Sequence, residues 1–187
     1  MASIKKLLAP ALLALLGIAQ AHSQELDPTA LKLMGVYGPH SQFAGPYVGA
    51  KFGVDWSERT GNDPRSTHST WYPGVLGVVN YDVNYDVNQF IVGFEGFGDF
   101  HHGSSTYKDG GVDLKLGMPV NGNIMPYARI GFTGTWPSAR LHYGAGVEYK
   151  FAKNWSVAGE YTGDSTSHDG SHFTNNSLTV GVHYYFF

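Results

Sequence analysis

The residues best suited to chemistry are charged side chains that recur at alternating positions within otherwise apolar stretches of the chain. They comprise eight acids and five bases: Lys51, Asp55, Asp82, Glu95, Asp99, Asp113, Lys115, Arg129, Arg140, Glu148, Lys150, Glu160 and Asp164. Charges removed from water must pair, because an isolated buried charge is very costly. The set therefore predicts a salt-bridged network that fixes the surrounding elements, with a gated ion path as the alternative.

Histidines form a second set, because five of them fall in stretches that resemble loops: His68, His101, His102, His168 and His172. Imidazoles suit zinc and copper, but these five lack the fixed spacing of metal ligands. We therefore expect solvated loop histidines, with no metal and no cofactor.

A nucleophile is hard to find in this sequence. The nearest approach to a Ser–His pair is His102-Gly103-Ser104. Such a pair also needs an acid to orient the histidine, and Asp99 or Asp109 could be assigned that role only by conjecture. We therefore predict that the protein is not an enzyme and has no catalytic residue.

Three aromatic residues, Trp71, Tyr72 and Phe173, stand among Ser, Thr, Gly and Asn in expected loops. Binding residues often lie on loops that a rigid scaffold positions, so these three are the candidate contact with a host or envelope partner. Alternatively, Trp71 and Tyr72 extend an aromatic belt at a bilayer interface.

The elements that position these residues are eight candidate strands of about ten residues, the length that a tilted strand needs to cross a bilayer. They are residues 47–56, 74–83, 90–100, 112–119, 124–134, 140–151, 155–164 and 177–187. Long polar connections alternate with short turns, which is typical of an outer-membrane barrel with both ends in the periplasm. The third connection on the outer side, at Trp136-Pro137-Ser138, is an exception because it is short.

The two faces of these strands differ in polarity. One phase carries apolar or small residues, such as Phe52, Phe94 and Val147, and the charged set occupies the opposite phase. A charge facing lipid costs about 2–4 kcal/mol near the bilayer midplane, so this separation favours an apolar face in lipid and a charged lumen. A soluble lipocalin-like barrel or sandwich is the alternative, with the apolar phase inward.

Composition narrows the class further. Residues 1–21 have the basic start, apolar core and Ala-Gln-Ala end of a secretory signal peptide, and we expect residues 22–45 to form a periplasmic lead-in. No later apolar run is long enough for a transmembrane helix. The chain has no cysteine, which excludes disulfides and thiolate metal sites, and its net charge of −3 without a basic block makes nucleic acid an unsuitable partner.

Several segments carry a family resemblance. Residues 45–53, Gly-Pro-Tyr-Val-Gly-Ala-Lys-Phe-Gly, resemble the opening strand of the OmpA-like and surface-antigen barrels. Residues 144–151, with Asn-Trp-Ser-Val at 154–157 and Glu160-Tyr161, resemble the sixth and seventh strands, and residues 180–187 resemble the closing strand. The resemblance implies that Tyr184, Phe186 and Phe187 form the signal read by the barrel-assembly machinery.

Together these features predict a monomeric, all-β protein: an eight-stranded antiparallel up-and-down transmembrane β-barrel over residues 46–187, in the bacterial outer membrane. Its expected partners are outer-membrane lipid and lipopolysaccharide. The expected role is structural, in envelope integrity, or surface-interactive, in adhesion. The alternatives are a lipid A deacylase-like enzyme, as some outer-membrane barrels are, and a narrow porin or ion channel.

Overall fold

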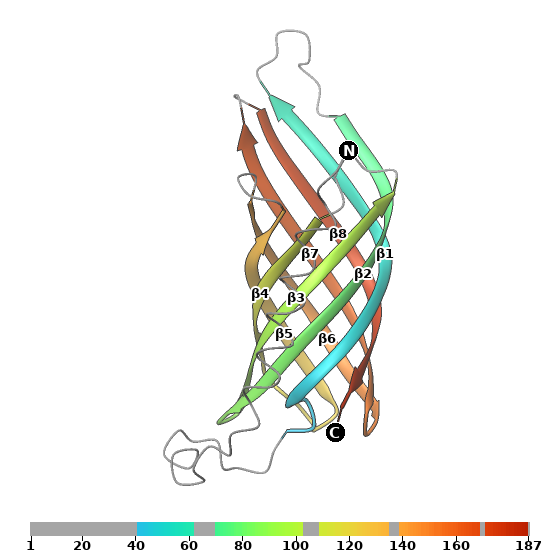
Figure 1. Ribbon diagram of the computed structural model, residues 1–187, viewed down its shortest axis with the longest axis vertical. Coiled ribbons are helices and arrows are strands. Elements are labelled where there is room, and N and C mark those ends of the chain that lie inside the picture. Colours follow the sequence, from blue (N-terminus) through green and yellow to red (C-terminus); the bar gives the residue numbers. More distant parts are fainter. Residues whose placement is uncertain (1–40, 62–69, 103–108, 135–138, 169–170, 187) are drawn as a thin grey trace, which may run out of the picture. The chain divides into compact units, whose positions relative to one another are not determined.

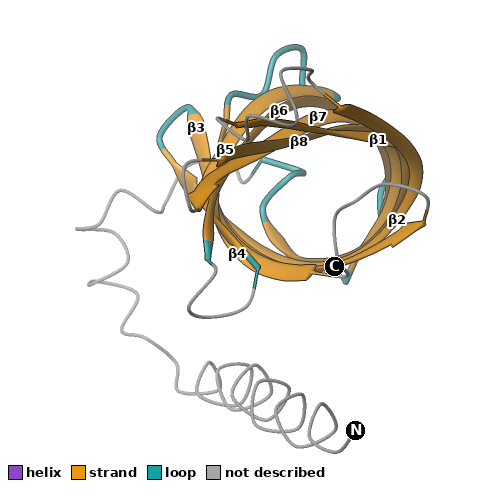
Figure 2. Cartoon of the chain, turned by 90° about the horizontal axis from the view of Figure 1, so that it is seen from above, coloured by secondary structure: helices purple, strands orange, loops and turns teal. Residues whose placement is uncertain are grey.

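The computed structural model describes residues 41–61, 70–102, 109–134, 139–168 and 171–186. Eight antiparallel strands make up almost all of this part of the chain: β1 (Gly45–Gly61), β2 (Thr70–Val87), β3 (Phe90–His102), β4 (Asp109–Gly117), β5 (Ile124–Thr133), β6 (Arg140–Ala152), β7 (Trp155–His168) and β8 (Ser171–Tyr185). Each strand pairs with the next, and β8 pairs with β1, so the sheet closes on itself (Figures 1 and 2). The predicted eight-stranded closed barrel is confirmed.

Alternation along each strand sets the two surfaces of the barrel, because successive side chains in a strand point to opposite faces. On β1, Lys51 is 4% exposed and its neighbour Phe52 is 68% exposed. The same alternation runs through β3, where Phe94 is exposed and Glu95 is buried. The barrel therefore turns its apolar side chains outward and its charged side chains inward, as the sequence predicts for a barrel in lipid.

Short turns gather at one end of the barrel, which we call the turn end. The β2–β3 turn uses Asn88 with φ of 58°, and the β4–β5 turn uses Asn121 and Gly122 with φ of 56° and 70°. Asparagine and glycine tolerate this left-handed conformation better than other residues. The first residues of β1 and the last of β8 lie at the same end, and the opposite end is the loop end (Figure 1).

Six strands reach farther at the loop end than predicted, and β1, β2, β7 and β8 do so by four residues or more. The β1–β2 ladder continues to Arg59 and Thr70, and β7 pairs with β8 as far as His168 and Ser171. Trp71 and Tyr72 therefore lie in β2 and Phe173 in β8, so their placement in loops was wrong. Only residues 169–170 separate β7 from β8, and this Asp-Gly pair is a strong sequence signal for a hairpin.

Glycines let inward side chains and neighbouring backbone approach closely. A methyl group added at Gly53 on β1 would collide with the backbone carbonyl oxygen of Leu178 on β8, whereas one added at Gly77 on β2 would meet nothing within 4 Å. We expect Gly53→Ala to lower the free energy of unfolding by about 1–3 kcal/mol through overpacking. Gly77→Ala, the matched control, should change it little; urea titrations in detergent that give equal losses would contradict this packing.

Aromatic side chains mark both rims of the outward surface. Near the turn end the Tyr184 ring packs against Trp155 and Phe186, with centroids 4.9 Å and 5.7 Å away. Near the loop end the Trp56 and Tyr161 rings lie 6.5 Å apart. Rings at these two levels suit the two bilayer interfaces. Phe187, the last residue of the predicted assembly signal, lies outside the described residues.

The segment before β1 has two parts. Residues 41–44 are described and lie against the turn end, and Gly45, assigned to the lead-in from the sequence, opens β1. Residues 1–40, which include the predicted signal peptide, lie outside the described residues. Among the described residues, no helix has the length and apolarity to cross a membrane.

Candidate functional site

All of the charged side chains singled out in the sequence lie on inward positions of the strands. Eleven of the thirteen are buried, and Asp99 and Arg140 are half-buried. Every one of the eight strands except β8 supplies at least one of them. The barrel closure therefore brings together, inside one lumen, acids and bases that are far apart in the sequence.

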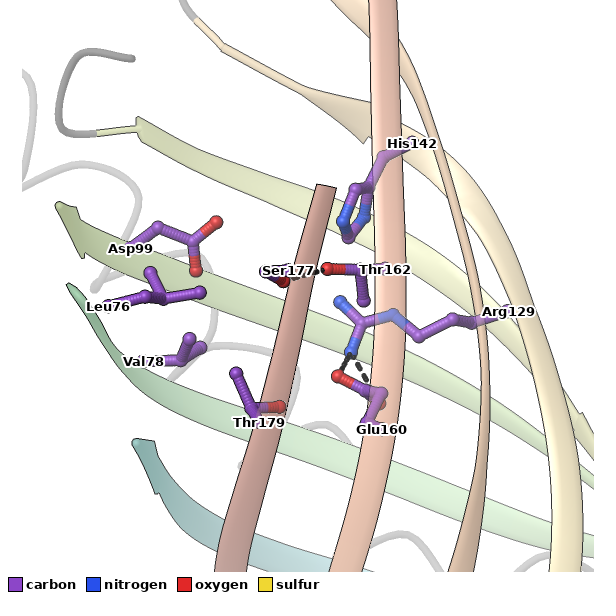
Figure 3. Close-up of a pocket in the computed structure, with 9 residues that line it drawn as sticks. All are labelled: Leu76, Val78, Asp99, Arg129, His142, Glu160, Thr162, Ser177 and Thr179. Carbon is purple, nitrogen blue, oxygen red and sulfur yellow. Dashed lines mark hydrogen bonds and ion pairs between the residues drawn. The ribbon is translucent and has the colours of Figure 1, made fainter. Parts of the chain in front are cut away.

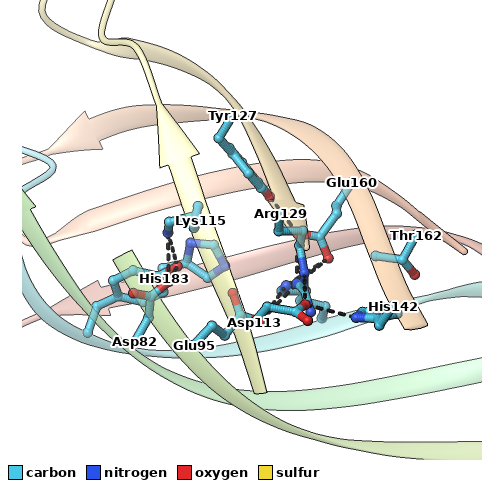
Figure 4. Close-up of polar contacts among 12 residues, drawn as sticks. Asp82, Glu95, Asp113, Lys115, Tyr127, Arg129, His142, Glu160, Thr162 and His183 are labelled. Carbon is cyan, nitrogen blue, oxygen red and sulfur yellow. Dashed lines mark hydrogen bonds and ion pairs between the residues drawn. The ribbon is translucent and has the colours of Figure 1, made fainter. Parts of the chain in front are cut away.

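Arg129 on β5 is the centre of this lumen (Figure 4). Its Nε donates to Asp113 Oδ2 at 2.5 Å, and its Nη1 donates to Glu95 Oε1 and Glu160 Oε1, both at 2.9 Å. Lys51 Nζ donates to the same two glutamates, to Glu95 Oε1 at 3.2 Å and to Glu160 Oε1 at 2.8 Å. All five side chains are no more than 3% exposed. We call them the central network.

The central network runs across the lumen, because four of its five ion pairs join strands that are not neighbours in the sheet. Lys51 on β1 reaches past β2 to Glu95 on β3 and past β8 to Glu160 on β7. Arg129 on β5 reaches past β4 to Glu95 and past β6 to Glu160. Two cations and two shared carboxylates therefore tie opposite walls of the barrel together.

A second cluster lies closer to the turn end, around Lys115 on β4. Its Nζ pairs with Asp82 Oδ2 of β2 at 2.7 Å and donates to the Tyr47 hydroxyl of β1 at 2.6 Å. Tyr47 donates in turn to Asp82 Oδ2 at 2.7 Å. The ammonium also lies over the rings of Tyr47 and Tyr127, 4.6 Å and 5.4 Å from their centroids. Such cation–π contacts strengthen when they are removed from water.

Glu148 on β6 anchors a third cluster. Its Oε1 accepts hydrogen bonds from Ser156 on β7 and from the Tyr185 hydroxyl on β8, and His183 Nδ1 lies 3.2 Å away. Lys150, the next inward residue on β6, donates to the Lys153 carbonyl oxygen and lies over the Tyr185 ring, 3.7 Å from its centroid. The three clusters together involve all eight strands.

Histidines are the residues that sequence reasoning placed least well. His101 was assigned to a loop, but it lies in β3 with its side chain 3% exposed and its Nδ1 2.7 Å from Asp55 Oδ2. His142 Nδ1 lies 2.8 Å from Asp113 Oδ2, and His183 faces Glu148. Three inward histidines thus lie beside acids of the charged set, in which eight acids outnumber five Lys and Arg residues.

The other described histidines of the expected loop set also lie on strands. His102 ends β3, His168 ends β7 and His172 lies in β8, where its Nδ1 is 3.0 Å from Ser167 Oγ. His68 lies outside the described residues, and so do Gly103 and Ser104, which follow His102 in the nearest approach to a Ser–His pair. Within the described ranges, no group of three or more His, Asp or Glu side chains could hold a metal ion.

Inward charged residues are more exposed near the loop end, where Asp99 and Arg140 are half-buried. Arg140 Nε donates to Asp164 Oδ1 at 2.7 Å, and Asn175 hydrogen-bonds to Asp164 and accepts from Ser57 Oγ. Between this level and the central network lies a small cavity with room for about one water molecule (Figure 3). It is lined by Leu76, Val78, Asp99, Arg129, His142, Glu160, Thr162, Ser177 and Thr179.

Sequence reasoning also missed the inward aromatic residues. Tyr47, Tyr127 and Tyr185 are at most 6% exposed, and each donates its hydroxyl to a lumen carboxylate. Phe97 lies inward as well, 4.9 Å from the Arg129 guanidinium. Tyr47, Phe97 and Tyr127 share the phase of the charged residues on their own strands, and Tyr185 lies on the polar phase of β8. This phase was a signal that they point inward, although no inward role was assigned to them.

Comparisons with known proteins give one family match. The family model described as outer membrane protein beta-barrel domain matches residues 11–186. No curated protein matches the chain. Among solved structures, Neisserial surface protein A is 17% identical with a TM-score of 0.47, over 76% of this chain and 98% of that one.

Two further solved structures match at similarly low sequence identity. Ail of Yersinia pestis, in complex with the heparin analogue sucrose octasulfate, is 15% identical with a TM-score of 0.42, over 75% of this chain and 99% of that one. The N-terminal barrel of Pseudomonas aeruginosa OprF is 12% identical with a TM-score of 0.36, over 72% and 97%. A family match across nearly the whole sequence, joined to a closed barrel with an apolar exterior, identifies a transmembrane barrel of the bacterial outer membrane. The chain belongs to the outer membrane protein beta-barrel domain family.

Proposed function

We propose that this barrel is a non-conducting scaffold of the outer membrane that strengthens the envelope and meets other molecules at its loop end. The observation that carries the first part is the central network. Its cations and carboxylates bridge opposite walls at 2.8–3.2 Å, and the nearby cavity has room for about one water molecule. An eight-stranded barrel encloses little more than its own side chains, so a hydrated ion has no path through this layer.

The second part is supported by the loop end of the barrel. There, β7, β8, β1 and β2 continue past the last paired residues of β3 and β6 (Figure 1). Beyond Trp56 and Tyr161 the outward phase of β1, β7 and β8 changes from apolar to polar, with Glu58, Ser167 and His172 exposed. With the short turns in the periplasm, this polar sheet stands clear of lipid on the cell surface. It is the surface on which adhesion or another envelope contact would occur.

Planar-bilayer recording of the purified full chain tests the scaffold proposal. We expect no stepwise conductance at moderate voltage, because the lumen is bridged at the central network. Steady unitary openings from the folded protein would overturn the proposal in favour of a narrow channel. Incubation with lipopolysaccharide tests the enzyme alternative in parallel, and release of fatty acid by the wild-type chain would favour a deacylase.

A further inference from the structure

Residues 41–44, which precede β1, lie in the mouth of the barrel at the turn end. The Phe43 side chain is 0% exposed and packs with Ile91 at the start of β3 and Met125 at the start of β5, both also 0% exposed. Tyr127 and Ala44 complete this apolar cluster. This apolar cluster differs from the charged lumen beyond it. None of the residues 41–44 takes part in the ion pairs of the central network.

Polar contacts hold the segment to different parts of the rim. The Ser41 amide donates to Asp86 Oδ2 at 2.8 Å, and Asn84 Nδ2 donates to the Phe43 carbonyl oxygen at 2.8 Å, so both tie it to β2. Gln42 Nε2 donates to Gly122 O at 2.5 Å and to Asn123 Oδ1 at 2.7 Å, which ties it to the β4–β5 turn. The Ala44 amide closes a turn onto the Ser41 carbonyl oxygen at 2.9 Å.

From these contacts we propose that residues 41–44 form a detachable cork that closes the turn end of the lumen independently of the central network. The cork adds no strand to the barrel, and the β1–β8 closure begins only after it, at Tyr47 and Tyr185. Its attachment is one buried ring and a few hydrogen bonds, those of Gln42 being exposed to solvent. It can therefore leave without breaking a strand pair or an ion pair, although Tyr127 both packs in its apolar cluster and donates its hydroxyl to Glu160 Oε2 at 2.8 Å. This goes beyond the proposed scaffold role, which needs only the central network.

Thiol accessibility in the full chain tests the cork, because the sequence has no cysteine and a single introduced thiol reports alone. Ile91→Cys places the thiol at a position that packs against Phe43. A charged maleimide should label it slowly, and Phe43→Ala in the same background should speed labelling at least about tenfold by raising the population of the open mouth. Phe43→Leu, which keeps an apolar plug, should give a smaller increase. Gln42→Ala removes only the contacts to the β4–β5 turn and should also give a smaller increase.

Two further thiols separate the cork from the central network. Gln89→Cys, in the exposed β2–β3 turn, should react at the same rate with and without Phe43→Ala. Thr133→Cys, which replaces a residue 2% exposed near the loop end, should stay protected in both backgrounds. Unchanged protection of Ile91→Cys in a folded Phe43→Ala barrel, or fast labelling while Phe43 is present, would overturn the cork. Labelling of Thr133→Cys that appears only with Phe43→Ala would overturn the independence of the cork from the central network.

Discussion

Replacing Arg129 with methionine is expected to lower the free energy of unfolding by about 3–5 kcal/mol, the usual cost of removing one partner from a buried ion pair. Methionine keeps much of the volume but leaves Asp113, Glu95 and Glu160 without the guanidinium that each of them contacts. Lys51 would then face two glutamates alone. Equilibrium unfolding in urea, followed by tryptophan fluorescence in detergent micelles, measures the loss.

Arg140→Met is the matched control for this prediction. Arg140 pairs with Asp164 near the loop end, where its side chain is 15% exposed, compared with 2% for Arg129. Because water reaches this pair more easily than it reaches Arg129, the control should lose clearly less stability than Arg129→Met. If the two variants lost equal stability, or if Arg129→Met lost none, the central network would not hold the barrel together.

A charge on the outward face should be nearly as damaging. Val180→Arg on β8 is expected to cost about 2–4 kcal/mol, because a lipid-facing arginine near the bilayer midplane loses its hydration. Val180 is 67% exposed and lies on the outward phase between Tyr184 near the turn end and the Tyr161 ring near the loop end. Folding into liposomes and reversible unfolding from them give the free energy directly.

Thr174→Arg serves as the control on the same face of the same strand. Thr174 pairs with Glu58 beyond the Trp56 and Tyr161 rings, where the outward phase is polar. An arginine there stays in water and faces an acid, so the substitution should change stability little. A Val180→Arg barrel as stable as the wild type would mean that this position does not face lipid.

The fold could be predicted from the sequence because its main signal is local. In a strand that separates lipid from a charged lumen, apolar and polar side chains must alternate. This alternation can be read from the sequence, for example where Phe52 follows Lys51 and where Phe94 precedes Glu95. The strand ends were less predictable at the loop end. Beyond the membrane both faces of β1 and β8 are largely polar, so alternation stops although the pairing of the strands continues to Gly61 and Ser171.

The site was only half predictable for a different reason. Alternation shows which charges point inward, but their partners depend on the height of each strand relative to strands across the lumen. Nothing local in the sequence shows that Arg129 reaches Glu160, or that His142 lies beside Asp113. Histidine and tyrosine were also ambiguous by type, since both occur in loops and belts as well as in buried polar networks.

The cork illustrates the limit of pattern reasoning most clearly. Residues 22–45 have no period, so the sequence offered no reason to dock any of them. Phe43 is held by packing against Ile91 and Met125, which lie on two strands that are distant in sequence. This packing site exists only after the barrel has closed.

The most direct test of the inverted barrel uses the wild-type chain without substitution. In lipid nanodiscs, nuclear Overhauser contacts from lipid acyl-chain protons to assigned valine methyl groups report which side chains touch lipid. Val78 and Val79 are neighbours on β2, 7% and 54% exposed, on opposite faces of the sheet. We predict strong acyl-chain contacts for Val79 and none for Val78. Contacts to Val78 without contacts to Val79 would contradict a lipid-facing exterior and a charged lumen.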